Sequence, residues 1–298
     1  MKLMKPEQGF LGLSEEESVS YDNARTAIIP FGLEKSVTYG SGTSKGPDAI
    51  LKASHALELF DEELMKQTYR DINLVTLQQP AIQTDLKKAL NQLSRLVKRV
   101  VTDHKFPLIL GGEHSITPAI VQILVEKFGA LRILHFDAHA DLRDQYDNNP
   151  HSHACAMRRC LDFPEIDIIS CGIRSISKQE ILFLKENQNR VTIYWAEDKS
   201  EWSMEEIACS FEDLPVYISI DVDGLDPSIM PATGTPEPNG LLWNEIINVI
   251  RAVSEKNRVI GADICELAPI SGFHACDFLV AKLAYKLLGL IFDAITIE

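Results

Sequence analysis

The sequence lacks any hydrophobic run long enough to cross a membrane. A spanning helix needs about 20 consecutive apolar residues, and no uninterrupted run in the 298-residue chain approaches that length. The first residues, MKLMKPEQGFLGLSEEES, also lack the long apolar core of a secretory signal. We therefore expect a soluble, cytoplasmic protein that does not act at a membrane.

Cysteine is sparse, and its spacing does not fit the common disulfide or zinc frameworks. The six cysteines are scattered through a long chain, and none forms a CxxC pair. Cys155 and Cys160 could form half of a zinc site, but no second pair follows at finger-like spacing. Reduced thiols, most of them buried, are the expected state.

Positive charge is also scarce. The chain has 29 Lys and Arg against 43 Asp and Glu, which gives a formal net charge of −14. A protein that binds nucleic acid needs a basic face for the phosphates, so this charge argues against a nucleic-acid partner. An acidic surface instead favours cationic ligands or metal ions, or serves solubility alone.

Short runs rich in Ile, Val and Leu predict the strands of a parallel sheet. The runs are apolar on both faces, as in strands buried between two layers of helices. They cover residues 26–30, 107–110, 131–136, 166–170, 191–194, 216–220 and 259–262. No repeat, linker or low-complexity tract divides the chain, so we expect a single domain over residues 1–298.

Segments with helical periodicity separate these runs. Thr84 is expected to cap a helix that carries apolar residues on one face as far as Val101. Pro118 suits the first turn of another helix, and Ser177 and Ser203 each precede a glutamate at the spacing of a capping box. The alternation predicts an α/β fold, a three-layer α/β/α architecture with a mainly parallel central sheet. Ligands in such folds bind at the carboxyl ends of the strands.

Histidine and aspartate are concentrated where three predicted strands end. The segments read GGEHS from residue 111, HFDAHAD from residue 135 and DVDGLDP from residue 221. Side chains two residues apart on an extended backbone point to the same side. Carboxylates gathered in this way behind buried strands repel one another unless a cation neutralises them. The candidate metal ligands are His114, Asp137, His139, Asp141, Asp221 and Asp223. Asp226, before a proline, is interpreted as a turn residue.

This donor set predicts two metal ions. Four carboxylates and two imidazoles are too many ligands, and too rich in oxygen, for one ordinary zinc ion. Four negative charges balance two dications. The set suits Mn²⁺ best, ahead of Zn²⁺, Co²⁺ or Ni²⁺, so we expect two Mn²⁺ per subunit. A pair of divalent ions lowers the pKa of a shared water, which indicates metal-assisted hydrolysis.

Several segments, taken together, resemble the ureohydrolases, the family of arginase and agmatinase. The similar segments are 111–117, 137–143 and 219–227, together with the glycine-rich loops 39–50 and 234–240. The resemblance covers nearly the whole chain in the expected order. It implies a three-layer α/β/α fold, a binuclear manganese site and hydrolysis of a guanidino or amidino group to urea and an amine. It also implies a homo-oligomer, either a trimer or a hexamer.

The same resemblance implies two catalytic residues. His153 matches a family histidine that assists proton transfer, although Ala154 stands where glycine is usual. His151, two residues earlier, is the competing candidate. Glu266 resembles the glutamate that binds the guanidinium. Glu113, His135 and Asp263 are expected to orient loops or ligands.

The substrate is expected to be a cationic guanidino compound, and agmatine, cleaved to putrescine and urea, fits best. In the loop 142–152, Asp144 and Asp147 could attract a remote ammonium and Tyr146 could line an aliphatic stem. Asn148 and Asn149 could equally address a carboxylate. Arginine, guanidinobutyrate and formiminoglutamate are therefore the alternatives. A catalytically silent metal-binding scaffold is the alternative from another class, and it would be expected to lose one of the eight site residues.

Overall fold

The computed structural model describes residues 1–297 and contains a parallel sheet of eight strands. The strands lie in the order β2-β1-β3-β8-β7-β4-β5-β6, and each neighbouring pair is parallel. Their bounds are β1 Thr26–Phe31, β2 Leu74–Thr76, β3 Phe106–Gly111, β4 Leu131–Phe136, β5 Ile166–Ile173, β6 Val191–Trp195, β7 Val216–Asp221 and β8 Val259–Cys265. The predicted parallel sheet is confirmed. The sequence reading missed β2, which has only three residues.

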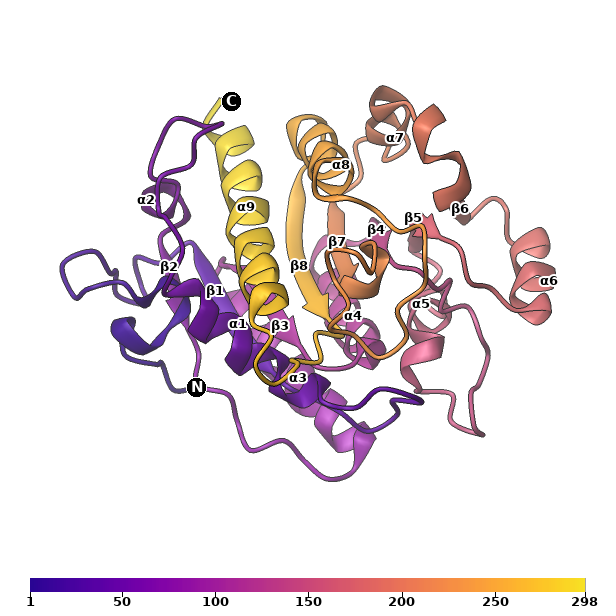
Figure 1. The fold of residues 1–298 in the computed structure, drawn as a ribbon, viewed down its shortest axis with the longest axis horizontal. Coiled ribbons are helices and arrows are strands. Elements are labelled where there is room, and N and C mark those ends of the chain that lie inside the picture. The colour runs from indigo at the N-terminus through magenta and orange to yellow at the C-terminus, as the bar shows by residue number, and fades with distance from the viewer. Residues whose placement is uncertain (298) are drawn as a thin grey trace.

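Helices cover both faces of the sheet, as Figure 1 shows. The α-helices are α1 Gly46–Ser54, α2 Tyr69–Ile72, α3 Leu86–Thr102, α4 Thr117–Phe128, α5 Ala156–Cys160, α6 Lys178–Glu186, α7 Met204–Cys209, α8 Trp243–Lys256 and α9 Ala275–Ile297. Helices α1, α8 and α9 pack with one apolar cluster, and α3, α4 and α5 pack with another. The predicted three-layer α/β/α architecture is therefore confirmed.

Short 3₁₀ helices lie between these elements. They are η1 Pro6–Gln8, η2 Phe10–Gly12, η3 Thr43–Lys45, η4 His114–Ile116, η5 His153–Cys155, η6 Ala196–Glu201 and η7 Val222–Gly224. Three of them, η4, η5 and η7, lie in the segments where the sequence predicts site residues.

Local sequence explains where several helices begin. The cap of α3 is Asp85 and not Thr84, because the Asp85 carboxylate accepts a hydrogen bond from the Lys88 N–H at 2.9 Å. Ser177 and Glu180 form the predicted capping box of α6. For Ser203, the described contacts include only the hydroxyl half of the box, from the Glu206 N–H.

Strand β6 differs from the other predicted strands in its burial. It lies at the edge of the sheet, where Val191 is buried and Thr192 is exposed. An edge strand has a neighbour on one side only, so its side chains are less enclosed than the sequence pattern predicts.

The structure describes the state of the cysteines and the character of the helices. All six cysteines are free, and five are buried while Cys209 is exposed. No helix within residues 1–297 has the length and apolarity needed to cross a bilayer. The single domain over residues 1–298 stays a prediction.

Candidate active site

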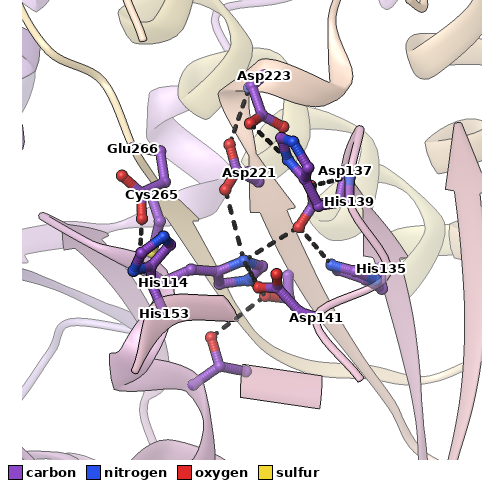
Figure 2. A network of polar contacts seen from close by, with 12 residues as sticks. His114, His135, Asp137, His139, Asp141, His153, Asp221, Asp223, Cys265 and Glu266 are labelled. Carbon is purple, nitrogen blue, oxygen red and sulfur yellow. Dashed lines mark hydrogen bonds and ion pairs between the residues drawn. The ribbon is translucent and has the colours of Figure 1, made fainter. Parts of the chain in front are cut away.

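Four neighbouring strands bring the predicted site residues to one edge of the sheet. Strands β3, β8, β7 and β4 are adjacent, and at their carboxyl ends lie His114, Glu266, Asp221 and Asp137. His114 and Glu266 are 152 positions apart in sequence, yet the backbone N–H of His114 donates a hydrogen bond to the Glu266 carboxylate. The parallel sheet is what assembles the cluster shown in Figure 2.

His114 points one ring nitrogen at three carboxylates. Its Nδ1 lies 3.2 Å from Oδ2 of Asp137, 3.2 Å from Oδ2 of Asp141 and 3.5 Å from Oδ2 of Asp221. This buried Nδ1 has no hydrogen-bond partner among the described residues. Atoms that each lie about 2.1 Å from one metal ion are separated by roughly 3–3.5 Å. The spacing is that of a ligand shell, and the dashed lines in Figure 2 meet at this nitrogen.

The other nitrogen of His114 is held by a buried chain of hydrogen bonds. Its Nε2 lies 2.9 Å from the Ser219 hydroxyl, which donates to Oδ1 of Asp263 at 2.9 Å. Thr117 and Tyr217 also donate to Asp263. Since the Ser219 proton goes to Asp263, the Ser219 oxygen accepts the proton of Nε2, and in the neutral ring the lone pair lies on Nδ1, toward the carboxylates. The predicted orienting role of Asp263 agrees with this geometry.

A second group of ligand atoms shares Asp137 with the first. Oδ2 of Asp223 lies 3.0 Å from Nδ1 of His139, and Oδ1 of Asp137 lies 3.5 Å from the same nitrogen. Potential ligand atoms come close together in two sets. The first set is His114, His135 and Asp137, and the second is Asp137, His139 and Asp223. Because Asp137 faces both groups with different oxygens, the arrangement has the form of two adjacent ion sites bridged by a carboxylate.

Hydrogen bonds from the backbone fix these aspartates. The N–H of His139 donates to Asp137 at 2.6 Å, that of Ala138 to Asp223 at 3.0 Å, and that of Asp223 to Asp221 at 2.9 Å. His135 contacts Oδ2 of Asp137 through Nε2 at 2.9 Å. The carboxylates are therefore held in place before any ligand arrives.

The electrostatics of the cluster are those of a site short of positive charge. Burial, together with the charges of Asp223 and Asp137, raises the pKa of Asp221 well above its usual value, and burial and Asp137 raise the pKa of Asp223. Burial also raises the pKa of Asp137, but the neighbouring imidazoles of His114 and His135 outweigh it, so this pKa lies well below its usual value. For His139, burial lowers the pKa, yet Asp137 and Asp223 raise it to about 11. These carboxylates cannot all be ionised together without added cations.

Glu266 and His153 lie at a cavity above the cluster. The cavity has a volume of about 280 Å³ and is lined by both residues together with His139, Asp141, Asp221 and Asp223. Oε1 of Glu266 accepts the N–H of His114 at 2.7 Å. Burial, with the charge of Glu113, raises the pKa of Glu266 well above its usual value although the His114 N–H opposes this. His114 and Asp137 are buried beneath the cavity.

Other parts of the cavity lining are aromatic and charged. Tyr39, Arg143 and Tyr146 belong to it, together with the buried Glu180. The Arg143 guanidinium lies 5.0 Å from the centre of the Tyr146 ring and 3.8 Å from Oε2 of Glu180. Two loops close one side, where a Cβ on Gly40 would lie 2.8 Å from Cα of Gly234. The chain backbones therefore touch at this point.

Some residues of the loop 142–152 lie away from the cavity lining. The Asp144 carboxylate is 73% exposed and pairs with Arg159 at 2.8 Å. Asp147 and Asn148 have positive φ values of 49° and 59° and form a tight turn. Neither these residues nor His151 is part of the lining, whereas Tyr146 is.

Sequence reasoning missed one residue that clamps the Asp223 segment. Arg174 donates from Nη2 to the carbonyl oxygens of Asp223 and Glu237, at 2.7 and 2.8 Å, and from Nε to that of Pro238 at 3.0 Å. It ties η7 to the loop beyond it. Every residue has a backbone carbonyl, so the residue types of the partners give no indication of these contacts in the sequence.

The fold and this geometry define an α/β enzyme whose carboxyl edge is built to bind metal ions beside a substrate cavity. The model of the Arginase family matches residues 24–289. The chain belongs to the arginase family, and it is a ureohydrolase, a hydrolase of carbon–nitrogen bonds in linear amidines.

Two curated relatives and one solved structure show the similarity. An N(1)-aminopropylagmatine ureohydrolase from Synechocystis is 35% identical over 288 residues, which are 93% of this chain and 92% of that protein. An agmatinase from Bacillus anthracis is 34% identical over 258 residues, 84% of this chain and 86% of that protein. The crystal structure of agmatine ureohydrolase of Thermoplasma volcanium superposes with a TM-score of 0.86 at 28% identity, and covers 98% of this chain and 96% of that one.

Proposed function

We propose that the protein hydrolyses agmatine to putrescine and urea with two Mn²⁺ ions at the carboxylate cluster. One observation carries the proposal: Glu266, a carboxylate suited to a guanidinium, lines the same cavity as the cluster. The agmatinase relatives support the choice of substrate. The family relationship alone supports the coarser statement that the substrate has a guanidino group.

The donor set fits two manganese ions. His114, Asp141 and Asp221 would hold one ion, His139 and Asp223 would hold the other, and Asp137 would bridge them, as the orphaned Nδ1 of His114 suggests. An oxygen-rich set with some imidazole suits Mn²⁺. When bound, such a pair of ions lowers the pKa of a shared water and stabilises negative charge that develops during hydrolysis.

Glu266 would bind the guanidinium of the substrate, and His153 would take part in proton transfer. A carboxylate holds a guanidinium through paired, charge-assisted hydrogen bonds, and Glu266 is anchored by the His114 N–H at 2.7 Å so that its position is defined. His153 lines the cavity, and histidine is the side chain best suited to give a proton to a departing amine near neutral pH. The two residues would orient the substrate and complete the proton transfer.

The aromatic part of the lining suits a substrate with an aliphatic chain and a remote cation. Aromatic faces attract ammonium groups, and Tyr39 and Tyr146 line this region. N(1)-aminopropylagmatine is the second candidate substrate. The Synechocystis relative is named for it, and Tyr39, 87% exposed, stands at an open part of the wall where a longer amine could pass.

Urea release tests the proposal directly. The protein is loaded with Mn²⁺ and assayed for urea with agmatine, N(1)-aminopropylagmatine, arginine and guanidinobutyrate, and for formamide with formiminoglutamate, whose formimino group cannot yield urea. We expect urea from agmatine. A clear preference for another guanidino compound would contradict the agmatine assignment, and no turnover of any compound would favour the silent scaffold.

Two further measurements test the metal and the assembly. Elemental analysis after loading should give two Mn²⁺ per subunit, with higher activity than after loading with Zn²⁺, Co²⁺ or Ni²⁺. We also propose a homo-oligomer, a trimer or hexamer, and light scattering of the purified protein measures its mass. A monomer would contradict this assignment.

A further inference from the structure

A hydrogen-bonded serine links the loop after β1 to His153. Ser36 accepts the backbone N–H of His153 at 2.9 Å through its hydroxyl oxygen. The same oxygen lies 3.3 Å from Nδ1 of the His153 ring. The two residues are 117 positions apart in sequence, so the contact depends on the tertiary fold.

Ser36 is itself held by a buried carboxylate. Glu113 is fully buried, and its Oε1 accepts the hydroxyl protons of Ser36 at 2.9 Å and Ser115 at 2.6 Å. Its Oε2 accepts the backbone N–H groups of Lys35 and Ser36 at 2.5 and 2.6 Å. Four donors thus converge on one side chain that acts only as an acceptor, which fixes the direction of the Ser36 hydroxyl.

Counting protons then determines how Ser36 meets the histidine ring. A serine hydroxyl has one proton and two lone pairs. The proton goes to Glu113 and one lone pair to the His153 N–H, so only a lone pair remains for Nδ1. A hydrogen bond between Ser36 and Nδ1 therefore needs Nδ1 as its donor. In neutral His153 this bond places the ring proton on Nδ1 and leaves Nε2 unprotonated.

We propose that Ser36 is a positioning residue that sets the tautomer and orientation of His153. This inference rests on the proposed role of His153 in proton transfer. Nδ1 is engaged by Ser36, and His153 lines the cavity, so Nε2 is the nitrogen left to exchange a proton with the substrate. Ser36 keeps that nitrogen ready to take a proton and to give it up.

The neighbouring Ser152 provides the competing arrangement. Its hydroxyl oxygen also lies 3.3 Å from Nδ1 of His153. If Ser152 donated to Nδ1, the ring proton would sit on Nε2. The two arrangements differ in one proton position and can be distinguished by spectroscopy.

Nitrogen NMR of the ring reads the tautomer without any assay of activity. The protein carries ¹⁵N-labelled histidine and diamagnetic Zn²⁺, and a His153→Gln variant assigns the signals. We expect the neutral ring of His153 to carry its proton on Nδ1, and Ser36→Ala to shift the population toward Nε2. A wild-type proton on Nε2, or an unchanged tautomer in Ser36→Ala, would overturn the proposal.

Kinetics test the same residue through its effect on turnover. Losing the orientation of an acid–base group costs roughly tenfold to a hundredfold in rate. We expect Ser36→Ala to lower kcat by that amount while KM stays within about twofold. Ser36→Thr, which keeps a hydroxyl, should restore most of kcat. The control is Ser41→Ala, an exposed serine of the same loop, which should behave as the wild type.

The outcomes separate this inference from the proposed function. If the wild type releases no urea from any compound, the proposed function fails, and NMR still decides whether Ser36 sets the tautomer of His153. If the wild type is active and Ser36→Ala keeps full kcat, the positioning role is wrong while the function stands. A fall in kcat that Ser36→Thr does not restore would also contradict it.

Discussion

Two polar clusters in this protein, each built around buried charged side chains, differ in whether their charges balance. Beside α9, Lys286 pairs with Asp61 at 2.8 Å and with Glu63 at 2.6 Å, and Arg251 pairs with Glu63 at 2.6 Å. Two cations therefore meet two acids. At the carboxyl edge of the sheet, four aspartates and Glu266 lie with the imidazoles of His114, His135 and His139. There the acids are in excess.

The pKa values report the same difference. Burial raises the pKa of Asp61, but the bond from Lys286 and the N–H of Leu64 outweigh burial, so the value is lowered. Burial and neighbouring carboxylates raise the pKa of Asp221 instead. In the first cluster, protein side chains alone balance the charges, and the ion pairs stabilise the fold. The second has an excess of acids, as a candidate site for cationic ligands should have.

Removing Lys286 should produce the largest loss of stability. Breaking a buried ion pair costs about 3–5 kcal/mol because the partner stays buried and uncompensated. Lys286→Met should therefore lower the free energy of unfolding in a denaturant titration by that amount, with bound metal unchanged. The double variant Lys286→Met with Asp61→Asn should recover part of the loss. A single variant within about 1 kcal/mol of the wild type would show that this pair is not a stabilising unit.

Removing a carboxylate from the other cluster should instead reduce metal and activity. Substitution of residues that only hydrogen-bond to metal ligands typically lowers metal affinity or activity by about 10–100-fold. Loss of a ligand itself should therefore lower kcat/KM by at least about a hundredfold. We expect Asp223→Ala and Asp141→Ala to bind fewer than two metals per subunit. Asp198→Ala, at an exposed position, is the control. Full metal content and turnover in either site variant would refute the ligand assignment.

Substitution of Arg174 tests whether the site depends on its backbone clamp. Lysine has one terminal nitrogen and cannot reproduce the fork of donors that reaches several carbonyl oxygens. Arg174→Lys should weaken metal binding by roughly tenfold while the circular dichroism spectrum stays unchanged. Metal affinity equal to that of the wild type would mean that Asp223 does not need this clamp.

Acid should lower the stability that the Lys286–Asp61 pair contributes, because Asp61 is protonated at low pH. Its folded pKa is lowered, so its contribution to stability is present above the unfolded value of about 3.9 and is lost as the pH falls through the folded value. Between pH 6 and 3 the free energy of unfolding should fall more steeply for the wild type than for Asp61→Asn. Parallel curves would contradict this assignment. Both proteins contain the same carboxylates at the candidate active site, so the difference between their stability curves reports the contribution of Asp61.

The sequence predicted the parts of the site that are local, and it missed those that depend on tertiary contacts. Alternate spacing predicted Asp137, His139 and Asp141 as one group, because neighbours on an extended backbone share a side. Asp141 faces His114 in the structure, but with a φ of 51° its backbone is not extended. The contact between Ser36 and His153 crosses 117 positions and has no local pattern.

The fold shows the same division. Long apolar strands were recognised, but β2 was too short to stand out. The cap of α3 was placed at Thr84, because Thr84 and Asp85 are both good capping residues and only the backbone geometry selects Asp85.

The contact between Gly40 and Gly234 limits which substitutions can change the shape of the cavity. A side chain at Gly40 would overlap the backbone of the opposite loop, so the width of the cavity there is set by two main chains rather than by exchangeable side chains. In this protein, a change of substrate specificity is therefore expected to come from side chains of the lining such as Tyr39 and Tyr146.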